Sequence, residues 1–236
     1  MLLEVSDLET GYGRTGVLHG INLAMAEDQR IGLFGPNGHG KTTLLMAISG
    51  LLPTWKGSIR FMGDDISNIA PRRIVDLGIV HVPQGNKLFP DMTVDENLSL
   101  GAYCKRSRPK ARANLERVYD IFPKLKQRGT QLCKTLSGGE RQMVSIGIGV
   151  MSDPKLLLLD EPTLGLAPKL KDELCDAIDR ISQSGLPLIV VEQDVEFLLT
   201  LAQDLYMINH GEVVQRLSAD DDIDHGEIMK MYFGEA

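Results

Sequence analysis

Residues 35–42 read GPNGHGKT, which is the most informative stretch of the chain. The spacing matches the pattern GxxxxGK[ST]. The stretch directly follows an apolar run, Arg30–Phe34, and directly precedes a helical pattern at residues 43–49. Glycines allow consecutive backbone N–H groups to turn inward onto phosphate oxygens, and the helix N-terminus adds the positive end of its dipole. The pattern therefore predicts a phosphate-binding loop between a buried strand and a helix.

The loop residues have separate expected roles. Lys41 would neutralise charge on the β- and γ-phosphates, and the Thr42 hydroxyl would ligate Mg²⁺. His39 fills a variable position of the pattern, and we expect no catalytic role for its ring. The predicted nucleotide contacts in this segment are Gly35, Pro36, Asn37, Gly38, His39, Gly40, Lys41, Thr42 and Thr43.

A second element of the phosphate site lies much later in the chain. Four leucines lead into Asp160 and Glu161, and ligands of open α/β sheets bind at the carboxyl ends of the strands. Asp160 is placed to hold Mg²⁺ through water, and Glu161 can orient or deprotonate the water that attacks the γ-phosphate. An aliphatic run ending in Asp-Glu is a weak signal alone, since it could be a simple strand end. Downstream of the phosphate loop it predicts the catalytic carboxylate.

The apolar pattern predicts an α/β fold. Nearly continuous aliphatic runs are typical of parallel strands covered on both faces by helices, and such runs occupy residues 30–34, 77–82, 155–160 and 187–192. Residues 2–8 and 17–26 read instead as strands of a small antiparallel layer, separated by glycines. Helical patterns dominate the middle of the chain, at residues 93–103, 109–121 and 139–151.

We therefore expect a single domain over residues 1–236, with a mostly parallel core sheet, an N-terminal antiparallel β layer and an inserted helical subdomain. The β layer and core would comprise residues 1–88 and 152–236, and the helical subdomain would comprise about 89–151.

Composition narrows the function classes. The chain has 236 residues and a net charge of −7, which argues against broad nucleic-acid binding. We interpret the basic residues crowded between 105 and 112 as a solvated surface. Three scattered cysteines predict neither a disulfide framework nor a zinc site. No apolar run approaches the ~20 residues of a membrane span, and acidic residues appear at once in the N-terminal segment. We expect a cytoplasmic protein that reaches a membrane only through partners.

These features alone fit a phosphate-loop kinase, GTPase or DNA motor as well as a transport ATPase. The segment Leu136-Ser137-Gly138-Gly139-Glu140 decides between them. Here the chain resembles the ABC ATPase family of phosphate-loop NTPases, whose signature is LSGGQ. A serine hydroxyl, glycine amides and a helix N-terminus make a second anion site, although the segment alone could be only a helix cap. The resemblance implies a head-to-tail dimer in which Ser137, Gly138, Gly139 and Glu140 of one subunit close over ATP held by the other.

Other positions match the same family. Tyr12 resembles the aromatic that stacks on adenine, with a buried core tyrosine as the alternative. Gln84 resembles the glutamine that senses Mg²⁺ and the γ-phosphate, and residues 163–168 resemble a dimer-contact loop. Gln193 stands where the family usually has a γ-phosphate-contacting histidine, and an amide cannot become a cation near neutral pH. The implied catalytic set is Glu161, Gln84, Gln193 and Lys41, and the implied metal set is Thr42, Gln84 and Asp160.

Within the family, the chain resembles the LivF-type ATPases of branched-chain amino acid importers, and their urea-importer counterparts are similar. The matching segments are residues 82–85, 88–90, 92–94, 96–98, 164–168 and 191–193, and Ile148 and Asp194 depart from the pattern. The resemblance implies ATP and Mg²⁺ as cofactors. Its implied partners are a second ATPase subunit, membrane permeases and, indirectly, a solute-binding protein, with no nucleic acid. The alternatives are a urea or amide importer, an exporter, a scaffold or assembly ATPase, and a module that holds ATP without hydrolysing it.

Overall fold

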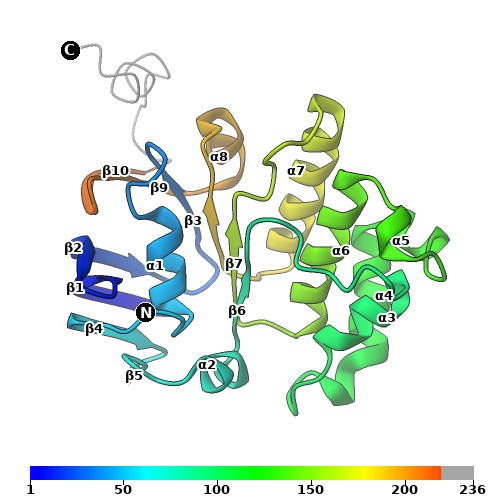
Figure 1. Cartoon of the computed structure of the whole chain (residues 1–236), viewed down its shortest axis with the longest axis horizontal. Helices are drawn as coiled ribbons and strands as arrows, with labels where there is room; N and C mark the ends of the chain where they lie inside the picture. Colours follow the sequence, from blue (N-terminus) through cyan, green and yellow to red (C-terminus); the bar gives the residue numbers. More distant parts are fainter. Residues whose placement is uncertain (219–236) are drawn as a thin grey trace. The chain divides into compact units, whose positions relative to one another are not determined.

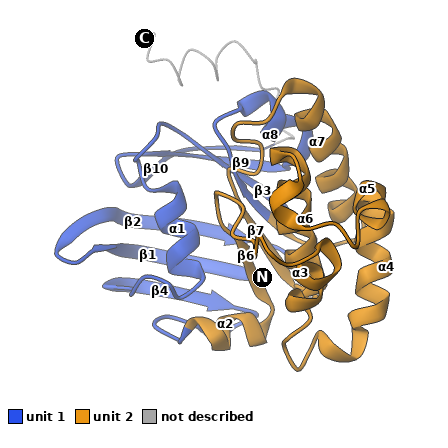
Figure 2. Ribbon diagram, turned by 45° about the vertical axis from the view of Figure 1, so that its right-hand side comes forward, with its two compact units in different colours: residues 1–70, 189–236 blue, residues 71–188 orange. Residues whose placement is uncertain are grey.

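A computed structural model describes residues 1–218 of the chain (Figure 1). The chain divides into two compact units (Figure 2). Among the described residues, the first comprises 1–70 and 189–218, and the second comprises 71–188. The predicted helical insertion, about 89–151, falls inside the second unit. Its exact boundaries stay a prediction.

The first unit begins with the predicted antiparallel layer. Its strand order is β2-β1-β4-β5, with bounds β1 Leu3–Tyr12, β2 Thr15–Met25, β4 Lys56–Phe61 and β5 Asp64–Asp65. Leu3 of β1 lies opposite Met25 on one side and Phe61 on the other, and all three side chains are buried. Apolar side chains on one face of each strand thus form the core of this layer. Neither β4 nor β5 was predicted from the sequence.

The same unit holds part of the core sheet, in the order β10-β9-β3-β8. The strands are β3 Arg30–Phe34, β8 Leu188–Val191, β9 Asp204–Asn209 and β10 Glu212–Ser218. β3 and β9 are parallel, and β9 and β10 form an antiparallel hairpin. Helices α1 Lys41–Ile48 and α8 Val195–Leu201 follow β3 and β8. The predicted strands at 30–34 and 187–192 are present, and β9 and β10 are additional.

The second unit contains the other parallel pair and most of the helices. Strands β6 Ile79–Val82 and β7 Leu156–Asp160 pair in parallel, with Ile79 opposite Leu156. The helices are α2 Pro71–Leu77, α3 Val94–Gly101, α4 Ala111–Ile121, α5 Pro123–Gln127, α6 Gly138–Met151 and α7 Pro168–Gln183, with short 3₁₀ turns at Arg108–Lys110 and Cys133–Thr135. All three predicted helical segments are therefore helical, apart from residues at their ends.

Helix α6 is the centre of this unit and packs against α3, α4, α5, β6 and β7. Glycines make the close approaches possible. A Cβ at Gly101 would lie 2.4 Å from the Ile148 carbonyl oxygen, and a Cβ at Gly149 would lie 2.8 Å from a methyl carbon of Val82. The signature helix is thus tightly packed along its length.

The parallel strand pairs, the antiparallel layer and the covering helices agree with the α/β fold class expected from the sequence. Across residues 1–218, no helix is both long and apolar enough to cross a bilayer.

Candidate functional site

The phosphate loop connects β3 to α1 in the first unit, as predicted. Gly35 has φ +139°, and a Cβ there would lie 2.0 Å from the Ile208 carbonyl oxygen of β9. Gly40 has φ +108° and is the N-cap of α1. Because L side chains rarely adopt such φ values, these two positions require glycine. The N-cap glycine also provides no side chain to cap the first turn of α1, where backbone donors and the helix dipole favour an anion.

Lys41 lies folded over this loop. Its side chain is 4% exposed, and its ammonium donates to the carbonyl oxygens of Gly35 at 2.7 Å and Pro36 at 3.0 Å. Thr42 is exposed beside it, and Thr43 is buried. The loop therefore presents a cation and a hydroxyl at the start of the same helix, which is the arrangement needed to hold a polyphosphate.

Tyr12 ends β1 next to this helix. Its ring is 47% exposed, and its hydroxyl lies 3.5 Å from the Thr43 hydroxyl and 3.4 Å from the Met46 sulfur. The exposure argues against the alternative of a buried core tyrosine. An exposed ring at this position is compatible with stacking on a base.

His39 connects the loop to the turn between β9 and β10. Its Nδ1 lies 2.7 Å from Asn209 Oδ1 and 3.1 Å from the His210 backbone nitrogen, and the tautomer decides whether Nδ1 donates to the first or accepts from the second. The His39 carbonyl accepts from the Gly211 N–H at 3.1 Å. The rings of His39 and His210 are tilted together with centroids 4.4 Å apart. His39 thus fixes the middle of the phosphate loop to a neighbouring hairpin. Sequence reasoning missed this role because Asn209 lies 170 residues away along the chain.

Gln193 is the second residue after the end of β8, the neighbour of β3 in the sheet. The adjacent Glu192 N–H donates to the Leu33 carbonyl of β3 at 3.1 Å. Asp194, which departs from the LivF-type pattern, caps α8 by accepting from the Phe197 N–H at 3.1 Å. The end of β8 is therefore held beside the strand that leads into the phosphate loop.

The second unit brings Gln84 and Glu161 together, although they are far apart in the sequence. Gln84 Nε2 donates to Glu161 Oε2 at 2.9 Å. Asp160 is 3% exposed at the end of β7, and Glu161 follows with φ +46°, an uncommon value for a non-glycine residue. Such backbone outliers are typical of functional sites because surrounding structure must hold them. The turn aims Glu161 at the glutamine named with it from sequence.

The signature segment forms the N-terminus of α6. Ser137 is the N-cap, its hydroxyl accepts from the Glu140 N–H at 3.3 Å, and Glu140 Oε2 accepts from the Ser137 N–H at 2.9 Å. This is a complete capping box. Glu140 Oε1 also pairs with Arg128 Nε at 2.8 Å. Arg128 was not named from sequence, since nothing in a local pattern predicts this pairing.

Glu140 carries a charge where the family signature has a neutral glutamine. Burial alone would raise its pKa. Hydrogen bonds from Ser137, with the positive charges of Arg128 and Lys124, instead hold the pKa of Glu140 below its usual value. The carboxylate form is the one that caps α6.

The two signature glycines have different surroundings. A Cβ at Gly138 would meet nothing within 4 Å, whereas a Cβ at Gly139 would lie 2.8 Å from Leu170 Cδ1 of α7. At Gly139, the terminal methyl group of Leu170 would have to move to admit a Cβ. Gly138 faces open space, so its own chain does not explain why a side chain is missing there.

A family model described as ABC transporter matches residues 18–164, which include the phosphate loop, Gln84, the signature turn and Glu161. The chain belongs to the ABC transporter family. ATP binding and ATP hydrolysis are therefore its activity, as the resemblance implied.

Relatives of this ABC protein match it over nearly its whole length. The branched-chain amino acid transport ATP-binding protein BraG of Pseudomonas aeruginosa is 34% identical over 233 residues, covering 99% of this chain and 100% of BraG. A probable LivF protein of Archaeoglobus fulgidus is 30% identical, with 99% of each chain covered. A solved ATP-binding cassette of an ABC transporter superposes with a TM-score of 0.86 at 26% identity, covering 99% of this chain and 97% of that one.

The residues named from sequence fall into two groups in this ABC subunit. The first unit holds Tyr12, the phosphate loop with Thr42 and Thr43, and Gln193. The second unit holds Gln84, Asp160, Glu161 and the signature turn with Ser137 and Glu140. That residues of both units contact nucleotide remains a prediction.

Proposed function

We propose that this chain is the ATP-hydrolysing subunit of an importer for branched-chain or related amino acids. Glu161 acts as the base or orienting group for the attacking water, and Gln84 positions it. The observation that carries this assignment is the 2.9 Å hydrogen bond between Gln84 and Glu161 at the end of β7. The amide hydrogen bond fixes the orientation of the Glu161 carboxylate, whose oxygens can then accept a proton or a hydrogen bond from the attacking water.

Lys41 and the N-terminus of α1 hold the β- and γ-phosphates, and Tyr12 stacks on the adenine. Gln193 donates an amide hydrogen bond toward the γ-phosphate in place of the family's histidine. These roles are consistent with the buried, loop-facing ammonium of Lys41 and the exposed ring of Tyr12.

Thr42, Gln84 and Asp160 would supply the oxygen ligands that Mg²⁺ prefers: a hydroxyl, an amide oxygen and a buried carboxylate. In residues 1–218, no group of three His, Cys, Asp or Glu side chains forms a metal cage. When bound, Mg²⁺ neutralises charge on the transferring phosphoryl group.

The Ser137–Gly139 turn completes the site of a partner subunit in a head-to-tail dimer. Support comes from Gly138, which faces open space and would allow a phosphate to approach the start of α6. The partner is a paralogue or a second copy. Permease subunits hold the dimer at the inner face of the membrane, and a solute-binding protein delivers the solute to them.

The solute class rests on the relatives. BraG and LivF are named as branched-chain amino acid transport proteins, and the chain matches both end to end. The substitution Glu161→Gln tests the hydrolytic assignment. We expect hydrolysis to fall by about 10²–10⁴-fold while ATP binding persists and ATP-dependent dimers accumulate. The matched control is Glu4→Gln, an exposed position in β1.

Near-normal turnover in the Glu161→Gln protein would reject the base assignment. The solute is tested separately, by uptake of labelled leucine and urea into vesicles that hold the complete transporter. Uptake of urea but not leucine would reject the amino-acid assignment and leave the ATPase assignment intact.

A further inference from the structure

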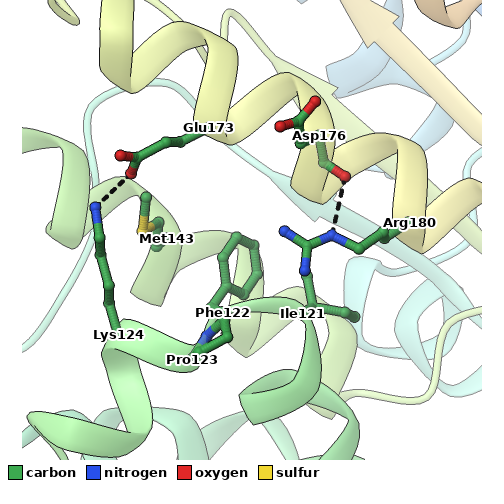
Figure 3. Close-up of a pocket in the computed structure, with 8 residues that line it drawn as sticks. All are labelled: Ile121, Phe122, Pro123, Lys124, Met143, Glu173, Asp176 and Arg180. Atoms are coloured by element: carbon green, nitrogen blue, oxygen red, sulfur yellow. Dashed lines mark hydrogen bonds and ion pairs between the residues drawn. The ribbon is translucent and has the colours of Figure 1, made fainter.

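A cavity of about 260 Å³ lies outside all the nucleotide-site residues, between α7 and the segment that joins α4 to α5 (Figure 3). We call it the α5–α7 pocket, and all its walls belong to the second unit. Its lining has two chemical halves. The floor is apolar, with Ile121, Phe122, Pro123 and Met143, and the rim is charged, with Lys124, Glu173, Asp176 and Arg180.

Three of the rim side chains come from one face of α7. Glu173, Asp176 and Arg180 are spaced by three and four residues, so they follow one another along the helix. In Figure 3 the Arg180 guanidinium reaches from α7 over the pocket toward Phe122 and Ile121. Lys124 closes the opposite side through an ion pair with Glu173 at 2.5 Å.

Arg180 is available to a ligand. Its contacts among the described residues are with backbone carbonyl oxygens only: Nε donates to Asp176 at 3.2 Å, and Nη1 donates to Asp120 at 3.4 Å. A guanidinium carries five donors in a planar fork that matches a carboxylate. The rim therefore offers a cationic fork and, within the same cluster, the carboxylates of Asp176 and Glu173.

The shape and charges select one class of small molecule. The volume lies just below the ~300–1,000 Å³ typical of sites for drug-sized ligands, which suits a metabolite of a few heavy atoms. The apolar floor requires an apolar body. The mixed rim requires both a carboxylate and an ammonium group, and its two acidic side chains disfavour polyanions such as nucleotides.

We propose that the α5–α7 pocket binds a free α-amino acid with an apolar side chain, of the size of valine, leucine or isoleucine. The carboxylate of the ligand pairs with Arg180, its ammonium group pairs with Asp176 and Glu173, and its side chain covers Phe122 and Met143.

The pocket adjoins the signature turn. Met143 lies on α6 one turn after Glu140, and the charge of Lys124 contributes to the low pKa of Glu140. A ligand seated here joins α5 and α6 to α7. If α5, α6 and α7 change their arrangement during the ATPase cycle, the ligand favours the arrangement that it binds more tightly. The size of that effect is set by the difference between its affinities for the two arrangements. The ligand class follows from the pocket alone. If the ligand is also the solute that the transporter imports, that identity rests on the proposed function.

The test is calorimetric titration of the purified full-length chain with L-leucine, without nucleotide. We expect a dissociation constant between about 10 μM and 1 mM. Two analogues each lack one charge: 4-methylpentanoate has no ammonium group, and isopentylamine has no carboxylate. Each should bind at least about tenfold more weakly, as should glutamate and lysine, whose charged side chains cannot cover the apolar floor.

The variant Arg180→Gln should weaken leucine binding at least about tenfold, and Lys169→Gln, an exposed change on the same helix outside the lining, should leave it unchanged. Met143→Trp should abolish binding by filling the floor. If that variant fails to fold, the exposed Arg180 position still decides the matter. The proposal is overturned if leucine shows no binding up to about 10 mM, if Arg180→Gln binds like the unmodified chain, or if either analogue binds as tightly as leucine.

This outcome is independent of transport. A complete transporter that carries a different solute would contradict the proposed function while leucine still bound the isolated chain. A leucine transporter whose ATPase subunit binds no leucine would contradict only the pocket assignment.

Discussion

Two glycine-rich segments of this ABC subunit each begin a helix, yet their first turns are built differently. The phosphate loop enters α1 through Gly40, which has a positive φ and no side chain to cap the helix. The signature turn enters α6 through Ser137, whose capping box with Glu140 satisfies backbone donors within the chain. The first helix start depends on unusual backbone conformation, and the second depends on side-chain hydrogen bonds.

This difference indicates how each segment meets a nucleotide. Around α1, the buried ammonium of Lys41 and the positive end of the helix dipole lie within one chain, where we expect them to hold phosphate. At α6, a ligand must share donors with an existing cap and approaches past Gly138. We infer that the phosphate loop determines affinity in the isolated subunit, and that the signature turn contributes only when a second subunit is present.

The largest effect is expected at the phosphate loop. Lys41→Ala removes the cation that neutralises the β- and γ-phosphates, so ATP turnover should fall by about 10³-fold and nucleotide binding by the isolated chain should be lost. Fluorescent-nucleotide titration and a phosphate-release assay measure the two effects, with Lys169→Ala as an exposed lysine control. Normal nucleotide affinity in the Lys41→Ala chain would contradict the assignment of the loop.

Ser137→Ala tests the other segment. Turnover in the assembled transporter should fall about 10–100-fold, because a hydrogen bond to a charged phosphate is worth about 1.5–3 kcal/mol. ATP affinity of the isolated chain should stay unchanged. The measurements are turnover of the complex and nucleotide titration of the single subunit.

The structure offers a closely matched control for this variant. Thr93 and Glu96 form the same capping box at the start of α3. Thr93→Ala should therefore cost the same stability, about 1 kcal/mol, without the loss of turnover. Equal losses in the two variants would reduce Ser137 to a structural cap.

The neighbouring glycines separate packing from ligand approach. Gly139→Ala places a methyl group against Leu170 and should lower the free energy of unfolding by about 1–3 kcal/mol. Gly138→Ala meets no atom of its own chain, so its stability should be equal to or higher than that of the unmodified protein. Thermal unfolding measures both. If Gly138→Ala also preserved ATP-dependent dimers, the nucleotide bound by the partner subunit would not approach α6 through the open space beside Gly138.

The sequence predicted the parts of the fold that depend on local patterns. Strands β3, β6, β7 and β8 are mostly aliphatic, which is the pattern of a buried strand. The glycine and lysine positions in residues 35–42 reflect the backbone and charge requirements of one turn. Strands β4 and β10 have mixed burial and β9 has polar ends, so none of the three was predicted from the sequence.

Contacts between distant segments were not predictable in the same way. The family pattern placed Glu140 at the nucleotide, and no local signal indicated that Arg128 would pair with it or that Leu170 would press against Gly139. The Gln84–Glu161 hydrogen bond was implied only through the shared phosphate that both residues were expected to approach. Such pairings depend on tertiary packing, which a single sequence specifies only weakly.

The smallest effect concerns how rigidly the phosphate loop is held. His39→Ala removes the Nδ1 contacts with Asn209 and the His210 N–H, while the backbone hydrogen bond from Gly211 to the residue 39 carbonyl can remain. Losing about 1 kcal/mol of positioning should raise the KM for ATP roughly threefold to tenfold with little change in kcat. His39→Asn, whose side-chain oxygen can accept from the His210 N–H, should recover part of the affinity. A fall in kcat at unchanged KM would instead place the imidazole in the chemical step, and the contrast between a rigid loop and a capped turn would need revision.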